Sequence, residues 1–357
     1  MKNKIMFFLL IFAPVALAAE LLHWPPLVIF ATSAMAIVPL ASFLSDATEA
    51  LVENTGPRIG GLLSSTLGNA AELIITLIAI REGQMALVAA SLIGSILGNV
   101  LLVLGAAILL GGLKNGVQRF DRDQGGLNAT LLFLAAIAIS APSLFNAAIE
   151  PDVMRVESLS MATSVVILVI YLLAVGYMLF AGGPEPEEIG PAVAHGKKGE
   201  SHWSLPVSLA VLAVSVIAIA LFSEFLVGSV EPVTEKLGFS AFFVGIILIP
   251  IVGNVAENIV AIEVAIKDKM DLSLNIALGS SLQIALFVAP ILVLVSPLLG
   301  HPFMLEFNVF ELVALVSAAL IASMVAIDGK SNWLEGAMLL AVYFILGIAF
   351  FFLPSAI

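Results

Sequence analysis

Long apolar segments follow one another along almost the whole chain. A helix that spans a bilayer needs about 20 mostly apolar residues, and lipid-exposed backbone must satisfy its own hydrogen bonds, which favours helices. Of the 357 residues, 61% are hydrophobic and only 11% are charged, far from the composition of a soluble domain. We therefore predict an all-α polytopic membrane protein in a lipid bilayer. The eleven predicted spans are 5–22, 26–44, 59–80, 84–110, 127–148, 158–180, 204–226, 239–266, 272–298, 303–326 and 333–353.

The composition also excludes several classes of function. The chain has no cysteine, so disulfides and thiolate metal sites are absent. Its net charge of −12 argues against nucleic acid as a partner. An intramembrane hydrolase would need a nucleophile with a base or a metal, and the four histidines all fall in loops or at span ends. We expect neither enzymatic activity nor a bound cofactor, and nothing in the sequence decides for or against a homo-oligomer.

The first span allows a second interpretation. Lys2 and Lys4 precede an apolar run that ends in Ala16–Ala19, which is also the pattern of a signal peptide with a cleavage site. We favour a leading transmembrane helix over residues 1–22.

The loops carry unequal positive charge on the two sides of the membrane. When alternate loops are pooled, one side holds 11 Lys and Arg residues and the other holds 3. Cytoplasmic loops are the positive ones, so the N-terminus is expected inside and the C-terminus outside. The short loops favour a prokaryotic plasma membrane. The three positively charged residues on the other side are Arg81, Arg155 and Lys236.

Two polar motifs occur twice at the same spacing. Gly68–Ile74 matches Gly253–Ile259, and Gly94–Leu97 matches Gly279–Leu282, both 185 positions later. Because polar residues seldom match in order inside apolar helices by chance, we interpret the matches as a duplication. The predicted organisation is the leading helix (1–22), a first five-helix repeat (26–181), a cytoplasmic linker with acidic residues (182–203) and a second five-helix repeat (204–353).

The charge asymmetry gives the two repeats opposite directions. The span that contains Glu72 runs from inside to outside, and the span that contains Glu257 runs from outside to inside. Inverted repeats are typical of secondary transporters, whose substrate site lies near the bilayer midplane between the repeats.

Each copy of the first motif has the sequence Gly-Asn-x-x-Glu inside a predicted span. A charged side chain at the bilayer centre costs roughly 2.5–3.5 kcal/mol on insertion scales, so two such residues at equivalent positions need an explanation. The Gly, Asn and Glu share one helix face, and the Gly can weaken the helix and free backbone carbonyls. The motif residues expected in the site are Gly68, Asn69, Glu72, Gly253, Asn254 and Glu257.

Two carboxylates carry the charge that one divalent cation or two protons neutralise. Ca²⁺ takes about 6–8 oxygen ligands, and an all-oxygen site suits Ca²⁺, Mg²⁺ or Mn²⁺. We predict that Glu72 and Glu257 are the metal ligands and that the cation and protons compete for them. Alternatively, protonated glutamates bonded to the asparagines could merely hold helices together, as small polar residues do in membranes. Further candidate ligands in the neighbouring spans are Ser95, Asn99, Ser280 and Gln283.

At these motifs the sequence resembles the Ca²⁺/cation antiporter superfamily, in particular its Ca²⁺/proton exchanger (CAX) branch. The resemblance implies eleven helices, one leading helix followed by two inverted five-helix halves. It also implies transported Ca²⁺ and protons, a central pair formed by Glu72 and Glu257, and an acidic cytoplasmic segment between the halves. The matching stretches are Gly56–Leu63, Leu67–Ile74, Ala90–Asn99, Ile251–Glu257, Lys269–Asp271, Gly279–Ala285 and Asp328–Ala337.

One position departs from the family pattern. Many members have His directly after the second motif's Glu, where this chain has Asn258. The glutamates are therefore expected to carry the protons themselves. The expected function is export of cytoplasmic Ca²⁺ in exchange for protons by alternating access. A Na⁺/Ca²⁺ or other cation exchanger of the same superfamily and a cation channel are the alternatives.

Overall fold

The computed structural model describes residues 2–55, 63, 66–148, 153–180 and 203–353. The predicted linker 182–203 lies outside the described residues except for its last position. The chain forms two compact units. The first comprises Met1–Ser91, His195–Ala256 and Phe351–Ile357, and the second comprises Leu92–Ala194 and Glu257–Phe350. Each unit therefore takes segments from both halves of the sequence.

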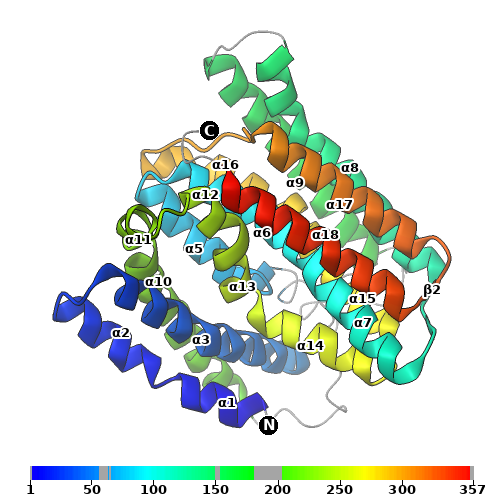
Figure 1. Cartoon of the computed structure of the whole chain (residues 1–357), viewed down its shortest axis with the longest axis horizontal. Coiled ribbons are helices and arrows are strands. Elements are labelled where there is room, and N and C mark those ends of the chain that lie inside the picture. Colours follow the sequence, from blue (N-terminus) through cyan, green and yellow to red (C-terminus); the bar gives the residue numbers. More distant parts are fainter. Residues whose placement is uncertain (1, 56–62, 64–65, 149–152, 181–202, 354–357) are drawn as a thin grey trace. The chain divides into compact units, whose positions relative to one another are not determined.

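In the first unit, α2 lies along α3, and α10 packs against both α3 and α5 (Figure 1). The short helix α13 contacts α3 and α5 as well. Helix α6 begins in this unit and continues into the second. The elements are α1 (Lys2–Leu9), α2 (Phe12–Leu21), α3 (Pro26–Thr55), α5 (Ala70–Arg81), α6 (Met85–Leu97), α10 (Leu205–Gly228), α11 (Val230–Leu237), α12 (Ala241–Phe243), the π-helix η3 (Val244–Leu248) and α13 (Ile249–Gly253).

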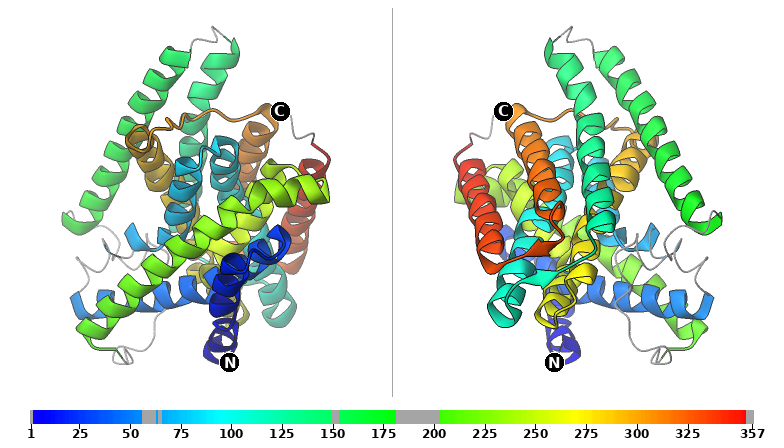
Figure 2. Two further views of the ribbon diagram at one scale, coloured as in Figure 1. Left: turned by 90° about the vertical axis from the view of Figure 1, so that its left-hand side faces the viewer. Right: turned by 90° about the vertical axis from the view of Figure 1, so that its right-hand side faces the viewer.

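In the second unit, α8 pairs with α9, as the two long green helices in Figure 2 show, and α8 also packs against α15 and α17. The elements are the π-helix η1 (Gly98–Val103), α7 (Leu104–Asn115), β1 (Gln118–Arg119), α8 (Arg122–Ala148), α9 (Val153–Phe180), α14 (Val255–Ile266), α15 (Met270–Gln283), the π-helix η4 (Ile284–Val288), α16 (Ala289–Val295), the 3₁₀-helix η5 (Ser296–Leu299), α17 (Val309–Ala326), β2 (Lys330–Ser331) and α18 (Trp333–Phe352).

The fold is that of a polytopic helical membrane protein, as predicted. Within the described residues, 8 helices are long and apolar enough to cross a bilayer, and Ala241–Gly253 with Val255–Ile266 forms a further span bent by 65°. The two remaining predicted spans coincide with shorter helices, the apolar segment Ile5–Leu21 and α5, before which most of 59–65 lies outside the described residues.

Three local features differ from the sequence prediction. Helix α3 continues to Thr55, well past the predicted limit at 44, because polar residues end the apolar stretch without breaking the helix. Residues 303–308 are not helical, and α17 starts at Val309, where Asn308 and Glu311 form a reciprocal capping box. Finally, β1 pairs with β2 in an antiparallel two-stranded sheet, with Gln118 opposite Ser331.

The secondary structure repeats at the spacing of the sequence motifs. Helix α5 (70–81) and helix α14 (255–266) are related by 185 positions at both ends, and α6 and α15 start at the equivalent Met85 and Met270. The turns between these helices also match, because Gly83 has φ +73° and its equivalent, Asp268, has φ +61°. Both residues are left-handed at a helix C-terminus, which is a common helix stop.

Glycines allow close helix contacts in the second unit. A Cβ on Gly336 of α18 would collide with the backbone nitrogen of Leu109 in α7, and a Cβ on Gly105 would lie 2.9 Å from the Cβ of Leu339. Small residues at such crossings are how membrane helices pack tightly where lipid offers no hydrophobic driving force.

Candidate functional site

The helix that carries the first glutamate starts where a turn interrupts the helical backbone. Gly68 and Asn69 form a turn, and Glu72 lies in the first turn of α5. Asn69 and Glu72 are buried, with exposed fractions of 2% and 4%. The Thr76 hydroxyl donates a 2.7 Å hydrogen bond to the Glu72 carbonyl. The break thus places a buried carboxyl at a helix N-terminus inside an apolar region.

The Glu72 carboxyl packs against the second copy of the motif. A Cβ on Gly253 would lie 3.0 Å from Oε1 and 3.2 Å from Cδ of Glu72. The space that Glu72 occupies therefore depends on the missing side chain at position 253. The two halves of the sequence meet here within the first unit.

The second motif forms an equivalent break. Asn254 separates α13 from α14 and has φ −93° and ψ 5°, close to φ −99° and ψ 27° at Asn69. Its side-chain nitrogen donates a 3.2 Å hydrogen bond to the carbonyl of Pro250. Glu257 then lies in the first turn of α14, as Glu72 does in α5.

Glu257 contacts a predicted ligand from the neighbouring helix. The Ser280 hydroxyl of α15 is hydrogen-bonded to the Glu257 carboxyl. Ser280 is 1% exposed. The second carboxyl oxygen, Oε2, is buried and has no hydrogen-bond partner among the described residues. Buried polar atoms are nearly always paired in native proteins, so this oxygen suits a cation or a proton.

The other predicted ligands from the neighbouring spans, Ser95, Asn99 and Gln283, also lie in the second unit. Asn99 lies in η1, which packs against α15, and its buried Nδ2 donates no hydrogen bond within the described residues. Gln283 is the last residue of α15, directly before the π-helix η4. Ser95 is 1% exposed in α6. The π-helices η1 and η4 have wide i→i+5 turns, which are frequently found at functional sites.

The predicted site residues fall into two groups. Gly68, Asn69, Glu72, Gly253 and Asn254 belong to the first unit, and the second unit holds Ser95, Asn99, Glu257, Ser280 and Gln283.

Apart from Gly68 and Glu257, these residues are buried or lie at close contacts in the structure. In the parts of the chain that the structure describes, no three His, Asp or Glu side chains gather as a metal-binding group. His23 and His301 are exposed, and His195 and His202 lie outside the described residues.

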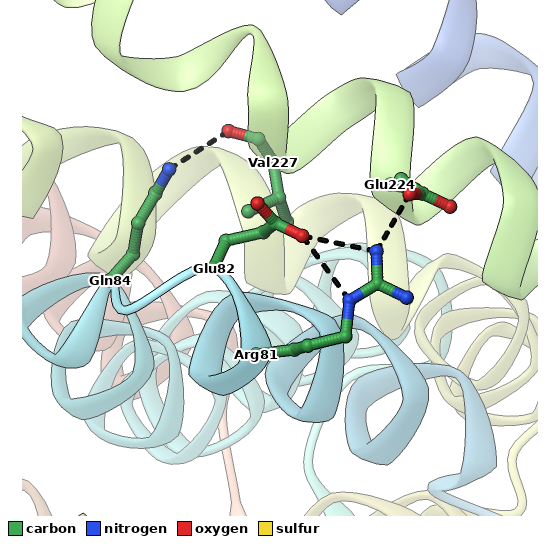
Figure 3. Close-up of polar contacts among 5 residues, drawn as sticks. All are labelled: Arg81, Glu82, Gln84, Glu224 and Val227. Atoms are coloured by element: carbon green, nitrogen blue, oxygen red, sulfur yellow. Dashed lines mark hydrogen bonds and ion pairs between the residues drawn. The ribbon is translucent and has the colours of Figure 1, made fainter. Parts of the chain in front are cut away.

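An ion pair at the far end of α5 was not anticipated from the sequence. Nη2 of Arg81 lies 2.6 Å from Oε1 of Glu224 in α10 and 3.0 Å from Oε1 of Glu82 (Figure 3). These hydrogen bonds, first of all the one to Glu224, raise the pKa of the Arg81 guanidinium. Beside the pair, Gln84 donates a 3.1 Å hydrogen bond to the Val227 carbonyl. In the sequence, only the scarcity of Lys and Arg in the loops of one predicted side draws attention to Arg81.

The fold and these motifs define a polytopic membrane protein with buried acidic motifs at repeated helix breaks, the class of secondary transporters. The chain belongs to the sodium/calcium exchanger protein family, whose model matches residues 25–180 and 207–352. This finding confirms the resemblance to the Ca²⁺/cation antiporters.

Similar proteins cover nearly the whole chain. The Ca²⁺/H⁺ antiporter of Aphanothece halophytica is 44% identical, over 99% of this chain and 98% of its own length. The Ca²⁺/H⁺ antiporter ChaA of Bacillus subtilis is 43% identical, over 98% of this chain and 100% of its own. The crystal structure of the Ca²⁺/H⁺ antiporter protein YfkE superposes with a TM-score of 0.85 at 40% identity, covering 98% of this chain and 100% of that one.

Proposed function

We propose that this protein is a secondary active antiporter that exports Ca²⁺ from the cytoplasm across a prokaryotic plasma membrane in exchange for protons. The observation that carries the proposal is the repeated Gly-Asn-x-x-Glu motif, with each glutamate in the first turn of a helix that starts at a break. Relatives that are 43–44% identical over nearly the full length carry the name Ca²⁺/H⁺ antiporter, which supports both ions.

Charge balance explains how one site could serve both ions. Glu72 and Glu257 together carry two negative charges when ionised, and either one Ca²⁺ or two protons neutralise them. A site that holds an uncompensated pair of carboxylates in the membrane is costly, so the empty, unprotonated state is disfavoured. Exchange follows if the protein changes its access only when the pair is neutralised.

The remaining ligands come from the buried amides and hydroxyls around each glutamate. Ca²⁺ needs about 6–8 oxygens, and two carboxylates supply at most four. Oε2 of Glu257 and the side-chain oxygens of Ser280 and Gln283 lie in the second unit, and the Asn69 and Asn254 side chains lie in the first. Backbone carbonyls released at the two helix breaks add to this set, as in other transporters with interrupted helices.

The breaks also favour movement of the site. Each glutamate lies on a helix of 12 residues, α5 or α14, which is about 18 Å long and shorter than the roughly 30 Å hydrocarbon core. Short half-helices can tilt at their breaks without unfolding a complete span. Alternating access around Glu72 and Glu257 is therefore the mechanism that we propose, with the N-terminus in the cytoplasm.

The proposal is tested with purified protein in vesicles. Ca²⁺ uptake is measured with an outward proton gradient, with an outward Na⁺ gradient and with neither, and the lumenal pH is recorded at the same time. We expect uptake only with the proton gradient, accompanied by loss of lumenal protons. Uptake driven by Na⁺ alone would identify a Na⁺/Ca²⁺ exchanger, and uptake that needs no counter-ion gradient and moves no protons would identify a channel.

A further inference from the structure

The two helices that carry the glutamates end in equivalent turns, but different interactions hold these turns. Helix α5 ends at Arg81 and the turn passes through Gly83, and helix α14 ends at Ile266 and the turn passes through Asp268. In the first turn Gln84 N–H bonds to the Ala79 carbonyl, and in the second Lys269 N–H bonds to the Val264 carbonyl. The backbone geometry is thus the same, and the side chains decide how each turn is fixed.

Neutral amides fix the turn after α14. Nε2 of Gln118 donates hydrogen bonds of 2.9 Å to the Ala265 carbonyl and 3.0 Å to Oδ1 of Asp268. Nδ2 of Asn115 donates a 3.2 Å bond to the Ile266 carbonyl. Gln118 is only 1% exposed, so salt screens its hydrogen bonds less than it screens an exposed ion pair.

An exposed ion pair fixes the turn after α5. Arg81 and Glu224 have side-chain exposures of 47% and 50%, and Arg81 also bonds to Glu82 in its own turn. The bond from Gln84 to Val227 attaches the same turn to the end of α10, as Figure 3 shows. We call Arg81, Glu224, Gln84 and Val227 the turn anchor. It combines an exposed ion pair with an amide hydrogen bond, whereas the amides of Gln118 and Asn115 attach the turn after α14.

The turn anchor can control where the Glu72 carboxyl lies. The other end of α5 begins at the Gly68–Asn69 break. Helix α5 packs along its side against α10, and its C-terminal turn is attached to the end of α10 by the turn anchor, so these contacts help to set its direction. Arg81 lies nine residues beyond Glu72, about 14 Å along the axis, so a tilt that starts at the anchor moves the carboxyl. A displacement of an ångström in a ligand is enough to weaken a site markedly.

We propose that Arg81 is a positioning residue for Glu72 and acts through its ion pair with Glu224. The inference rests on the proposed function, since it assumes that Glu72 binds the transported cation. In this proposal Arg81 is not a ligand of either ion. Because the pair is half exposed, its loss should leave the fold intact. The expected effect is a change in the position of the Glu72 carboxyl.

The experiment is a double-mutant cycle on Ca²⁺/H⁺ exchange in vesicles. Arg81→Gln and Glu224→Gln should each raise the KM for Ca²⁺ by about two- to fivefold, the size expected for an exposed pair, with little change in the maximal rate. The double variant should match the single ones, because a broken pair cannot be broken twice. Arg81→Lys keeps a charge at this position and should remain within about twofold of the wild type.

The direction in which the KM for Ca²⁺ changes in Arg81→Gln and Glu224→Gln distinguishes positioning from surface electrostatics. If these residues only changed the local concentration of Ca²⁺, Arg81→Gln would lower the KM and Glu224→Gln would raise it. Positioning requires a rise in both. The matched control is Lys267→Gln, which breaks a 2.6 Å pair with Glu263 that is equally exposed but links no second helix. It should leave the KM unchanged.

Salt gives a further readout. Raising the ionic strength from about 0.1 M to about 1 M shortens the screening length from about 10 Å to about 3 Å, so the wild-type KM should approach that of the variants. Opposite shifts, additive shifts or an unchanged KM in the single variants would overturn the inference. Failure of the proposed function would look different, because the wild type itself would then exchange no Ca²⁺ for protons.

Discussion

Oε1 of Glu72 lies 3.0 Å from the position that a Cβ on Gly253 would occupy. The glycine of the second motif thus leaves room for the carboxyl of the first, although the two residues are 181 positions apart in the sequence. This contact links the repeated motifs through packing, in addition to any role as ion ligands.

Gly253→Ala should disturb the site without unfolding the protein. The new methyl group would force the Glu72 carboxyl to move by a few tenths of an ångström, and we expect the KM for Ca²⁺ to rise about tenfold, equivalent to about 1.4 kcal/mol. Initial rates of Ca²⁺ uptake at several Ca²⁺ concentrations measure this change. Gly176→Ala in α9 is the control, because a Cβ there meets no atom within 4 Å. An unchanged KM in Gly253→Ala would show that the contact is not part of the site.

Ser280→Ala removes the hydroxyl that is bonded to the Glu257 carboxyl. A hydrogen bond to a charged group contributes about 1.5–3 kcal/mol, so Ca²⁺ affinity should fall by about tenfold or more. The matched control is the next residue. Among the described residues, the Ser281 hydroxyl donates its hydrogen bond to the Ala277 carbonyl of its own helix, at 2.9 Å, and Ser281→Ala should bind Ca²⁺ like the wild type. Calcium titrations of the purified variants compare them, and equal affinities for both would remove Ser280 from the site.

Gly336→Ala tests the fold away from the site. The added methyl group would collide with the backbone of Leu109, and backbone cannot move aside as a flexible side chain can. We expect a loss of about 1–3 kcal/mol of stability, as for other overpacked positions, seen as a lower thermal midpoint in detergent. Gly126→Ala in α8 has open space around its Cβ and should keep the wild-type midpoint. Equal midpoints would mean that α7 and α18 are not closely packed there.

The sequence predicted the membrane class and the approximate positions of most spans, because hydropathy is summed over a local window. The duplicated motifs could be found because the same polar residues recur in order 185 positions apart. The sequence also carries a signal for the start of α17, since Asn308 and Glu311 have the spacing of a capping box. The apolar residues from 303 onward instead led to a predicted start that is too early. The apolar content of a segment indicates whether it can span the bilayer, whereas side-chain hydrogen bonds determine where a helix begins.

Other features depend on contacts that no local pattern encodes. Arg81 and Glu224 are 143 residues apart, and each alone looks like an ordinary charge at a span end. The packing of Gly253 on Glu72 is similar, because the sequence indicated a weak helix at that glycine but not the side chain that fills its place. The π-helices after Leu97 and Gln283 have the same apolar composition as the α-helices that they interrupt.

We propose that Glu72 and Glu257 exchange protons for Ca²⁺. The most direct measurement is the release of lumenal protons when Ca²⁺ is added to acid-loaded vesicles that contain the wild type, Glu72→Gln, Glu257→Gln or Glu263→Gln. Glutamine keeps the shape of the side chain but can neither ionise nor release a proton. We predict proton release from the wild type and from Glu263→Gln, whose carboxyl is 50% exposed in a pair with Lys267, and none from the other two variants. Wild-type proton release from either Glu72→Gln or Glu257→Gln would show that the substituted glutamate does not carry the exchanged protons.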